Sequence, residues 1–381
     1  MRRALTGNGV VSWGAMRSRA QVIAVHPAMT QTSLAQELAA LYADVGRDVH
    51  FVQAKSESSA MAACIGASAT GTRAFTATST QSLAAMHQML HQAALERLPM
   101  VMAIARGWSQ RTERSDPLAQ RDTGWLQFYC QSSQEGLDTI VQAFRICEQV
   151  SLPGMLILDH DVFSAVAEPV DIPDQKKADR YLPSFRPEHK LDVKTPHCFG
   201  PPISSQEYGQ LRRQMHLAMA KTLQVVRKAD QDYRKFFGRG HGLVENYRCR
   251  GAETILVVSG PVANAAREVV DRLRAQGDRV GLVRVRLFRP FPAQLIRDVL
   301  KGAKKVAVVE ADVSPGGEGI FHQEIKSALY SLKPRLKAPL FGFIVELSEG
   351  DTTSEGIFQV FHRTQKRSQP EEDIIWIGAK G

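Results

Sequence analysis

The chain has 381 residues, of which 44% are apolar, enough for two or three globular domains of ordinary size. Its formal net charge is +9, but Lys and Arg are spread along the chain without a helix-turn-helix, zinc-finger or RNA-binding motif, which argues against nucleic-acid binding. No stretch approaches the roughly 20 apolar residues of a transmembrane helix, and residues 1–16 lack the apolar segment of a signal peptide. We therefore expect a cytoplasmic protein that does not bind membranes.

Short apolar runs alternate with helical patterns over the first 160 residues. Strands are predicted at 21–25, 49–53, 74–78, 99–105 and 153–158, and helices at about 33–44, 57–70, 81–95 and 134–150. This alternation is typical of a mostly parallel sheet covered by helices. The connection at 106–125 is long and charged, and loops of that length are usually functional or mobile.

The predicted helix at 57–70 begins with Glu57 and then consists almost entirely of small residues. Ser56 is a suitable N-cap, and a first-turn carboxylate stabilises the helix dipole by roughly 0.3 to 1 kcal/mol, so Glu57 can have a purely structural role. The small side chains, however, allow the helix backbone to approach something closely. That neighbour is another helix, a partner chain or a flat ligand.

The composition changes in the second half of the chain. Residues 165–205 are rich in Pro, Lys and Asp, which predicts a linker that runs over the surface, followed by a polar helix at 205–238. Further strands are predicted at 253–258, 279–285, 304–310 and 339–345, with helices at about 261–276, 292–301 and 318–332. We therefore divide the chain into a first domain at 1–170, a linker and polar helix at 171–250, and a second α/β domain at 251–381.

Several motifs of nucleotide-binding and metal enzymes are missing from the sequence. It contains no P-loop, no G-x-G-x-x-G turn between a strand and a helix, no G-x-S-x-G and no H-E-x-x-H. We interpret RGHGL as a chance pattern. The SPGGEG segment, with Gly316 and Gly317, is either an ordinary turn or an anion site at a helix N-terminus. The five cysteines include no C-x-x-C pair, so we expect reduced thiols and no metal site.

An ordered set of motifs resembles a known family. These are GNGVVSWGA, HPAMTQTS, SESSAMAACIGASATGTRAFTATSTQSLAAMHQML, AQRDTGWLQFY, EPVDIPDQ, FGRGHGLVE and LFRPFP. Together they resemble the α subunit of the 2-oxoacid:ferredoxin oxidoreductases, the pyruvate:ferredoxin oxidoreductase superfamily. The resemblance implies a pyrimidine-binding domain of the thiamine diphosphate enzymes followed by a transketolase C-terminal-like domain.

The resemblance also implies partner chains. In this family a β subunit brings the diphosphate and Mg²⁺ site, and the G-D-G…N motif of that site is absent from this sequence. The γ and ferredoxin-like subunits complete the complex, with iron–sulfur clusters on partner subunits, coenzyme A as co-substrate, and ferredoxin or another acceptor receiving the electrons. Thiamine diphosphate would therefore be shared between this chain and its partner.

Specific roles follow for residues that match the family motifs. Glu57 matches the glutamate that hydrogen-bonds N1′ of the aminopyrimidine and so promotes removal of the thiazolium C2 proton. Pro27 and Ser79 match positions around the cofactor. Arg106 matches an arginine that binds the substrate carboxylate through two parallel hydrogen bonds.

The loop after Arg106 carries further candidates. Three more arginines, which we expect to be structural, to bind the partner or to bind substrate, are Arg111, Arg114 and Arg121. The residues that match family positions shaping this loop are Asp122, Thr123 and Gly124.

One departure from the family concerns the substrate. The family stretch Y-P-I-T-P reads His26, Pro27, Ala28, Met29 and Thr30 here, so Met29 replaces a threonine that lies beside the substrate. An apolar thioether thereby replaces a hydroxyl, unless Thr30 or Thr32 compensates. The arginine-rich loop is also shorter than the family pattern. We therefore expect a larger or aromatic 2-oxoacid such as phenylglyoxylate, with retained use of pyruvate as the alternative.

Two other functions remain open from the sequence alone. A non-oxidative thiamine decarboxylase or synthase usually carries both cofactor domains on one chain, which argues against that class. A non-catalytic scaffold would have kept the fold and lost the chemistry. Glu57 and Arg106 argue against a scaffold, whereas the altered HPAMTQTS stretch is compatible with one.

Overall fold

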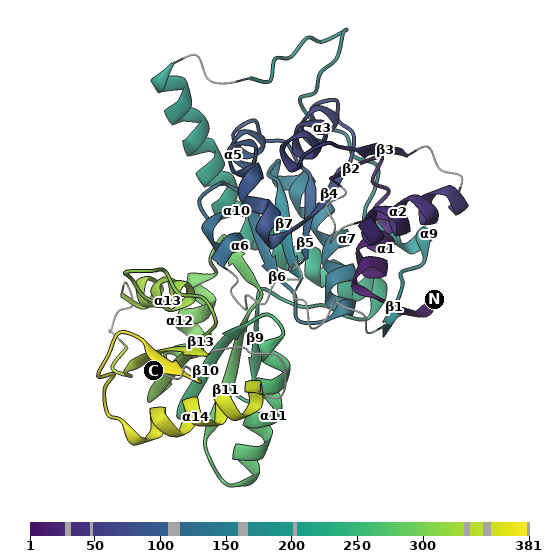
Figure 1. Cartoon of the computed structure of the whole chain (residues 1–381). Helices are drawn as coiled ribbons and strands as arrows, with labels where there is room; N and C mark the ends of the chain where they lie inside the picture. Colours follow the sequence, from purple (N-terminus) through teal and green to yellow (C-terminus); the bar gives the residue numbers. More distant parts are fainter. Residues whose placement is uncertain are drawn as a thin grey trace. The chain divides into compact units, whose positions relative to one another are not determined.

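The computed structural model describes residues 1–26, 32–45, 49–105, 115–158, 167–200, 204–330, 336–345 and 352–378. The chain forms two compact units, of which the first contains Met1–Trp108 and Ala119–Gly242 and the second contains Ser109–Leu118 and Leu243–Gly381 (Figure 1). The first unit thus includes the polar helix, α10 (Ser205–Phe237), for which the sequence predicted 205–238.

The first unit is built on a parallel sheet. Its strands lie in the order β6-β7-β5-β4-β2-β3, and every neighbouring pair is parallel, as the alternating pattern predicted. The strands are β2 (Val22–Val25), β3 (His50–Gln53), β4 (Ala74–Ser79), β5 (Val101–Ala105), β6 (Leu126–Tyr129) and β7 (Gly154–Leu158). The sequence did not predict β6, although all four of its residues are buried.

Helices cover both faces of this sheet. The helices α3 (Glu57–Ala69) and α5 (His87–Leu95) pack together on one face, and α1 (Gly7–Arg17), α2 (Thr32–Val45) and α7 (Ser133–Val150) on the other (Figure 1). Two short elements, α4 (Thr80–Leu83) and η1 (Ala84–Met86), precede α5, and α6 (Ser115–Ala119) precedes β6. The sequence did not predict α1. Thr6 is the N-cap of this helix, and its hydroxyl oxygen accepts a hydrogen bond from the amide of Gly9.

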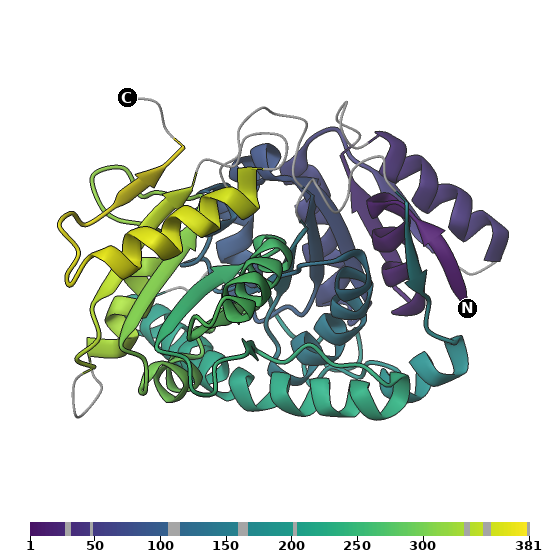
Figure 2. The same ribbon diagram turned by 90° about the horizontal axis from the view of Figure 1, so that it is seen from below.

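The segment predicted as a linker contains regular structure. The strand β8 (Glu168–Asp171) pairs antiparallel with β1 (Arg2–Leu5), and α9 (Gln175–Tyr181) follows with Asp174 as its N-cap. Farther along the chain, α10 packs on α7 and α9, and in Figure 2 it runs along one side of the first unit. The Pro-rich composition therefore hid a strand and a helix that tie this segment to the first unit.

The second unit is a smaller α/β sheet in the order β15-β14-β13-β10-β11-β9, parallel except for β9. Its strands are β9 (Val244–Tyr247), β10 (Thr254–Ser259), β11 (Val280–Val285), β13 (Lys305–Glu310), β14 (Leu340–Val345) and β15 (Ile375–Ile377). The short strand β12 (Leu287–Arg289) is not part of this sheet. Its helices are α11 (Val262–Ala275), α12 (Ala293–Leu300), α13 (Ile320–Tyr330) and α14 (Thr352–Lys366). The sequence predicted the four central strands and the first three helices, but not β9, β12, β15 or α14.

The SPGGEG segment proves to be a turn between β13 and α13. The carboxylate of Glu310 accepts hydrogen bonds from the amides of Phe321 and His322, at 2.8 and 3.0 Å. These amides lie in the first turn of α13, where an external anion would bind. An internal carboxylate therefore already takes the anion's place, which argues for the turn interpretation.

Two general sequence expectations can be compared with the described residues. All five cysteines are free thiols, and three of them, Cys64, Cys130 and Cys147, are buried. Among the helices that the structure describes, none is both long and apolar enough to cross a bilayer.

Candidate functional site

The parallel sheet of the first unit brings several predicted site residues to one edge. Ser79 at the end of β4 is in register with Ala105 at the end of β5, and Ala105 is in register with Leu158 at the end of β7. On the other side of β4, His26 follows β2, and Glu57 lies four residues after β3. Ligands of open α/β sheets bind outside the carboxyl ends of the strands, so this edge is the candidate site.

Glu57 is the first residue of α3 and is only 6% exposed. The predicted N-cap is confirmed, because Ser56 Oγ accepts a hydrogen bond from the amide of Ser59 at 3.1 Å. Ser58 Oγ donates to the carbonyl of Ala85 in η1 at 2.7 Å and so ties the start of α3 to the neighbouring segment. A carboxylate that served only the helix dipole would remain in water at no desolvation cost, whereas Glu57 is buried at the sheet edge.

Ser79 and His26 lie at the same edge. Ser79 is the N-cap of α4, since its Oγ accepts from the amide of Ser82 at 3.3 Å and donates to Ser82 Oγ at 3.0 Å. His26 Nδ1 lies 3.1 Å from the carbonyl oxygen of Ala54, which links the ends of β2 and β3. Because a carbonyl can only accept, Nδ1 carries the proton in this bond.

The remaining predicted contacts to cofactor and substrate lie outside the described residues. They are Pro27, Met29, Thr30 and Arg106, with the further loop candidates Arg111 and Arg114. In the sequence these residues come after the segments that form β2 and β5. Their individual roles stay predictions.

The end of the long connection is described and is tightly held. Thr123 Oγ1 donates to the carbonyl of Gln120 at 2.7 Å, and Gln120 Oε1 lies 2.6 Å from His87 Nδ1. Gly124 has a positive φ of 91°, and a Cβ there would lie 2.5 Å from the sulfur of Met215. These contacts support a loop-shaping role for Thr123 and Gly124.

The two charged residues beside them are less constrained. The Arg121 guanidinium lies 3.9 Å from the Asp122 carboxylate, and the Asp122 side chain is 78% exposed. Such an exposed pair contributes little to stability. Asp122 therefore lies at the surface of the loop rather than within its hydrogen-bonded part.

A buried ionic cluster in the first unit was missed by the sequence interpretation. Asp138 on α7 is fully buried and accepts hydrogen bonds from Tyr233 Oη at 2.7 Å and Arg239 Nε at 2.6 Å, and His241 Nε2 lies 3.0 Å away. Burial alone would raise the pKa of Asp138, but the hydrogen bonds from His241 and Arg239 outweigh it and hold that pKa below its usual value. Arg239 and His241 of the RGHGL segment thus have a structural role that the sequence interpretation did not assign.

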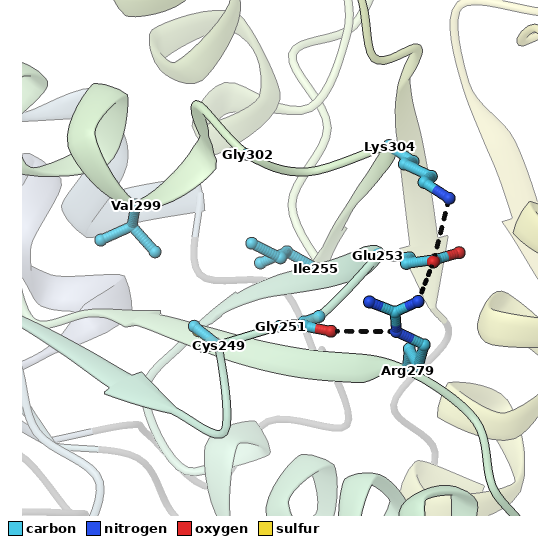
Figure 3. A pocket seen from close by; sticks show the side chains of 9 residues that line it. Cys249, Gly251, Glu253, Ile255, Arg279, Val299, Gly302 and Lys304 are labelled. Atoms are coloured by element: carbon cyan, nitrogen blue, oxygen red, sulfur yellow. Dashed lines mark hydrogen bonds and ion pairs between the residues drawn. The ribbon is translucent and has the colours of Figure 1, made fainter.

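The second unit contains a pocket at the edge of its sheet where the strands begin, not at the carboxyl ends. Its lining comes from the turns that precede β10, β11 and β13, at the amino ends of these strands (Figure 3). At its rim Glu253 pairs with Arg279 at 2.6 Å and with Lys304 at 2.9 Å. Ligands of such sheets bind at the carboxyl ends of the strands, whereas this pocket lies at the amino ends. We therefore interpret these ion pairs as surface contacts rather than as part of a ligand site.

Comparisons with known proteins agree with this geometry. Residues 13–231 match the family described as pyruvate flavodoxin/ferredoxin oxidoreductase, thiamine diphosphate-binding, and residues 252–356 match pyruvate:ferredoxin oxidoreductase core domain II. Pyruvate synthase subunit PorA of Methanothermobacter thermautotrophicus is 38% identical over 99% of this chain and 98% of its own length. Ketoisovalerate oxidoreductase subunit VorA of Pyrococcus horikoshii is 34% identical over 100% of this chain and 98% of its own length.

Solved structures share the fold at lower identity. The 2-oxoglutarate:ferredoxin oxidoreductase from Magnetococcus marinus superposes with a TM-score of 0.71 at 17% identity, covering 96% of this chain and 65% of that chain. A split-gene transketolase superposes with a TM-score of 0.57 at 14% identity, covering 96% of this chain and 99% of that chain. The family matches and the full-length relatives together show that this chain belongs to the 2-oxoacid:ferredoxin oxidoreductase family, as one of its α subunits.

Proposed function

We propose that this chain is the α subunit of a thiamine diphosphate enzyme that oxidatively decarboxylates a 2-oxoacid in a coenzyme A-dependent reaction. Electrons would pass through iron–sulfur clusters on partner subunits to ferredoxin or a similar acceptor. In this proposal the first unit is the pyrimidine-binding domain and the second is the transketolase C-terminal-like domain. The observation that carries the proposal is the burial of Glu57 at the carboxyl edge of the sheet, inside the thiamine diphosphate-binding family match.

The surroundings of Glu57 fit the pyrimidine half of the cofactor. A buried carboxyl group is a suitable partner for a ring nitrogen, because partial desolvation favours sharing a proton over full ionisation. The residues that directly follow Glu57 in the first turn of α3 are Ser58, Ser59 and Ala60, all with small side chains. When bound, thiamine diphosphate would supply the electron sink for decarboxylation. Glu57 would hold and return a proton at N1′.

The uncovered face of α3 supports a site completed by a partner. Ser59, Ala62, Gly66 and Thr70 recur at helical spacing and are all exposed. Within the described part of the chain, nothing lies within 4 Å of a Cβ built at Gly66. This small-residue face begins at Ser59 in the first turn of α3, so a chain that packed on it would lie against the helix that carries Glu57. We assign that role to the β subunit that carries the diphosphate and Mg²⁺ site.

The experiment for this proposal is Glu57→Gln in the assembled complex. The amide cannot exchange a proton with N1′, so we expect hydrogen–deuterium exchange at thiazolium C2 to fall at least about 100-fold, the usual range of general acid–base catalysis. Glu371→Gln is the matched control, because it makes the same change on a side chain that is 68% exposed. Exchange at the wild-type rate in Glu57→Gln would reduce Glu57 to a helix-capping residue.

The substrate proposal rests on Met29. Relatives of similar identity are named for pyruvate and for ketoisovalerate, so the family accommodates side chains of different size at comparable sequence distance. An apolar thioether in place of a hydroxyl favours a larger or aromatic 2-oxoacid such as phenylglyoxylate over pyruvate, 2-oxoglutarate or oxalate. Steady-state assays with a low-potential acceptor would compare kcat/KM across these acids. A clear preference for pyruvate would show that Met29 does not set specificity.

A further inference from the structure

A part of the first unit extends beyond its helices and sheet. Residues 183–200 and 204–214, here called the arm, comprise an irregular segment and the first turns of α10, and Figure 1 shows them reaching past α3 and α5. Every residue from Ser204 to Gln214 is exposed except the half-buried Leu211. Beyond this point α10 packs on α5 and α7, and its first buried residue, Met215, lies next to Gly124.

The inward stripe of α10 continues into the arm. Its buried side chains are separated by seven residues from Met215 to Thr222, and by three or four residues from Thr222 through Val226 and either Ala229 or Asp230 to Tyr233. The same spacing upstream reaches Leu211 and Tyr208, and Tyr208 is 47% exposed. The face that packs on the first unit therefore runs past it for two further turns.

The irregular part of the arm presents apolar side chains too. Leu191 is 47% exposed and Val193 is 96% exposed. The segment is nevertheless anchored, because the amide of Leu191 donates to the carbonyl of Ala69 at 2.7 Å and the rings of His189 and His197 stack at 4.7 Å. Ala69 is the last residue of α3, so the arm contacts that helix at its C-terminal end through Leu191.

The charge of the arm indicates the kind of surface that it would meet. Its described residues include five Lys or Arg side chains and three Asp or Glu side chains, and the whole chain carries +9. Association with a second copy would bring two basic surfaces together, whereas an acidic protein surface would be attracted. Continuity with the face of α3 favours the same chain that we assign to that face.

We propose that the arm binds an acidic surface of the partner subunit that covers α3, with Tyr208, Leu211 and Val193 as its apolar contacts. This inference rests on the proposed function, which supplies the partner. A partner held both at the face of α3 and at the arm would be positioned at each end of that helix. The arm would thus fix the orientation in which the partner brings its half of the cofactor site to Glu57.

The test uses the full-length chain and a purified β-type chain that contains the G-D-G…N motif. We expect Tyr208→Glu and Val193→Glu each to raise the Kd of the complex at least tenfold, because each places a carboxylate against an acidic surface. Leu217→Glu is the matched control, since Leu217 is 57% exposed on the same helix but lies off the stripe. Thermal melting of each isolated variant would verify that the chain still folds.

Several outcomes would overturn the proposal. Wild-type affinity in both arm variants, or an equal loss in Leu217→Glu, would contradict it. A third outcome would also contradict it: the wild type forms a homodimer, Tyr208→Glu is monomeric, and both bind the β-type chain with the same affinity. Glu57→Gln separates this result from the proposed function: normal binding with normal C2 exchange would refute the role of Glu57 and leave the arm unaffected.

Discussion

Asp138 and Glu57 are both buried carboxyl groups of the first unit, and their surroundings suggest different roles. Asp138 is bound by side chains of α7, α10 and the segment after α10, including Gln134, Tyr233 and Arg239. Arg239 also donates to the carbonyl of Asp171 in β8, so one carboxylate connects three parts of the unit. Such a closed set of donors is typical of a structural ion pair rather than a reactive acid.

Replacing Asp138 should therefore lower stability in a pH-dependent way. The folded-state pKa of Asp138 lies below its unfolded value, so its charge stabilises the fold above the unfolded pKa, and this contribution is lost as pH falls through the folded pKa. Asp138→Asn should lower the free energy of unfolding by about 3 kcal/mol at neutral pH, because Arg239 loses its buried counter-charge. The difference from wild type should shrink as pH falls below the ordinary value of 3.8.

Chemical denaturation monitored in the first unit would measure this difference. Asp122→Asn makes the same change on a side chain that is 78% exposed, so it should leave the unfolding free energy unchanged at every pH. A pH-independent loss in Asp138→Asn would show that the cluster acts through shape and hydrogen bonds rather than charge.

The Asp138 cluster also shows how much of a buried site could be predicted from the sequence alone. Asp138 lies among buried residues of a helix that the sequence predicted correctly at 134–150, observed as Ser133–Val150. An acid in such a position requires a cationic partner, which was the available signal. The partner could not be found from the sequence, because Arg239 and His241 lie about a hundred positions away, at separations of 101 and 103 residues. Glu57 was found because its local motif is contiguous.

At the scale of elements, the sequence predicted strands that are long apolar runs and helices with clear spacing. The segment PGMLIL became β7, all of whose residues are buried, as expected for a central parallel strand. The short strands at sheet margins, β9 and β15, have mixed burial and gave no such run. The helix α1 contains three glycines in GNGVVSWGAMR, which lowered its helical signal although most of its residues are buried.

The helix α3 was predicted at 57–70 and observed at Glu57–Ala69, but its uncovered face required the structure. Gly66 lies on that face, and a Cβ added there would meet open space among the described residues. Gly66→Ala should stabilise the isolated chain by up to about 1 kcal/mol, because alanine loses less backbone entropy in a helix. Gly66→Leu should leave the isolated chain folded and weaken binding of the partner, since a bulky side chain would keep the partner away from the exposed face of α3.

Thermal melting of the isolated variants and titration with the β-type chain would measure these effects. If Gly66→Leu bound the β-type chain as tightly as the wild type, the exposed face of α3 would not be the interface. A lowered melting temperature in Gly66→Ala would show that another part of the chain covers Gly66.

At the scale of the whole molecule, the proposed function has this chain contribute one side of a shared site. The carboxyl edge of the first unit holds the buried Glu57 and the cap Ser79. The sequence has no G-D-G…N motif and no P-loop, so it provides no recognisable cradle for a diphosphate. The relatives that match along the full length are named as subunits, which agrees with a chain that acts with partners.

The most direct test of this half-site is calorimetric titration of the isolated full-length chain with thiamine diphosphate and Mg²⁺. Because the pyrimidine side alone contacts a small part of the cofactor, we predict no micromolar binding by this chain. Micromolar binding should appear once the β-type chain with the G-D-G…N motif is added. Micromolar binding by the isolated chain would contradict the half-site and require a diphosphate site within these 381 residues.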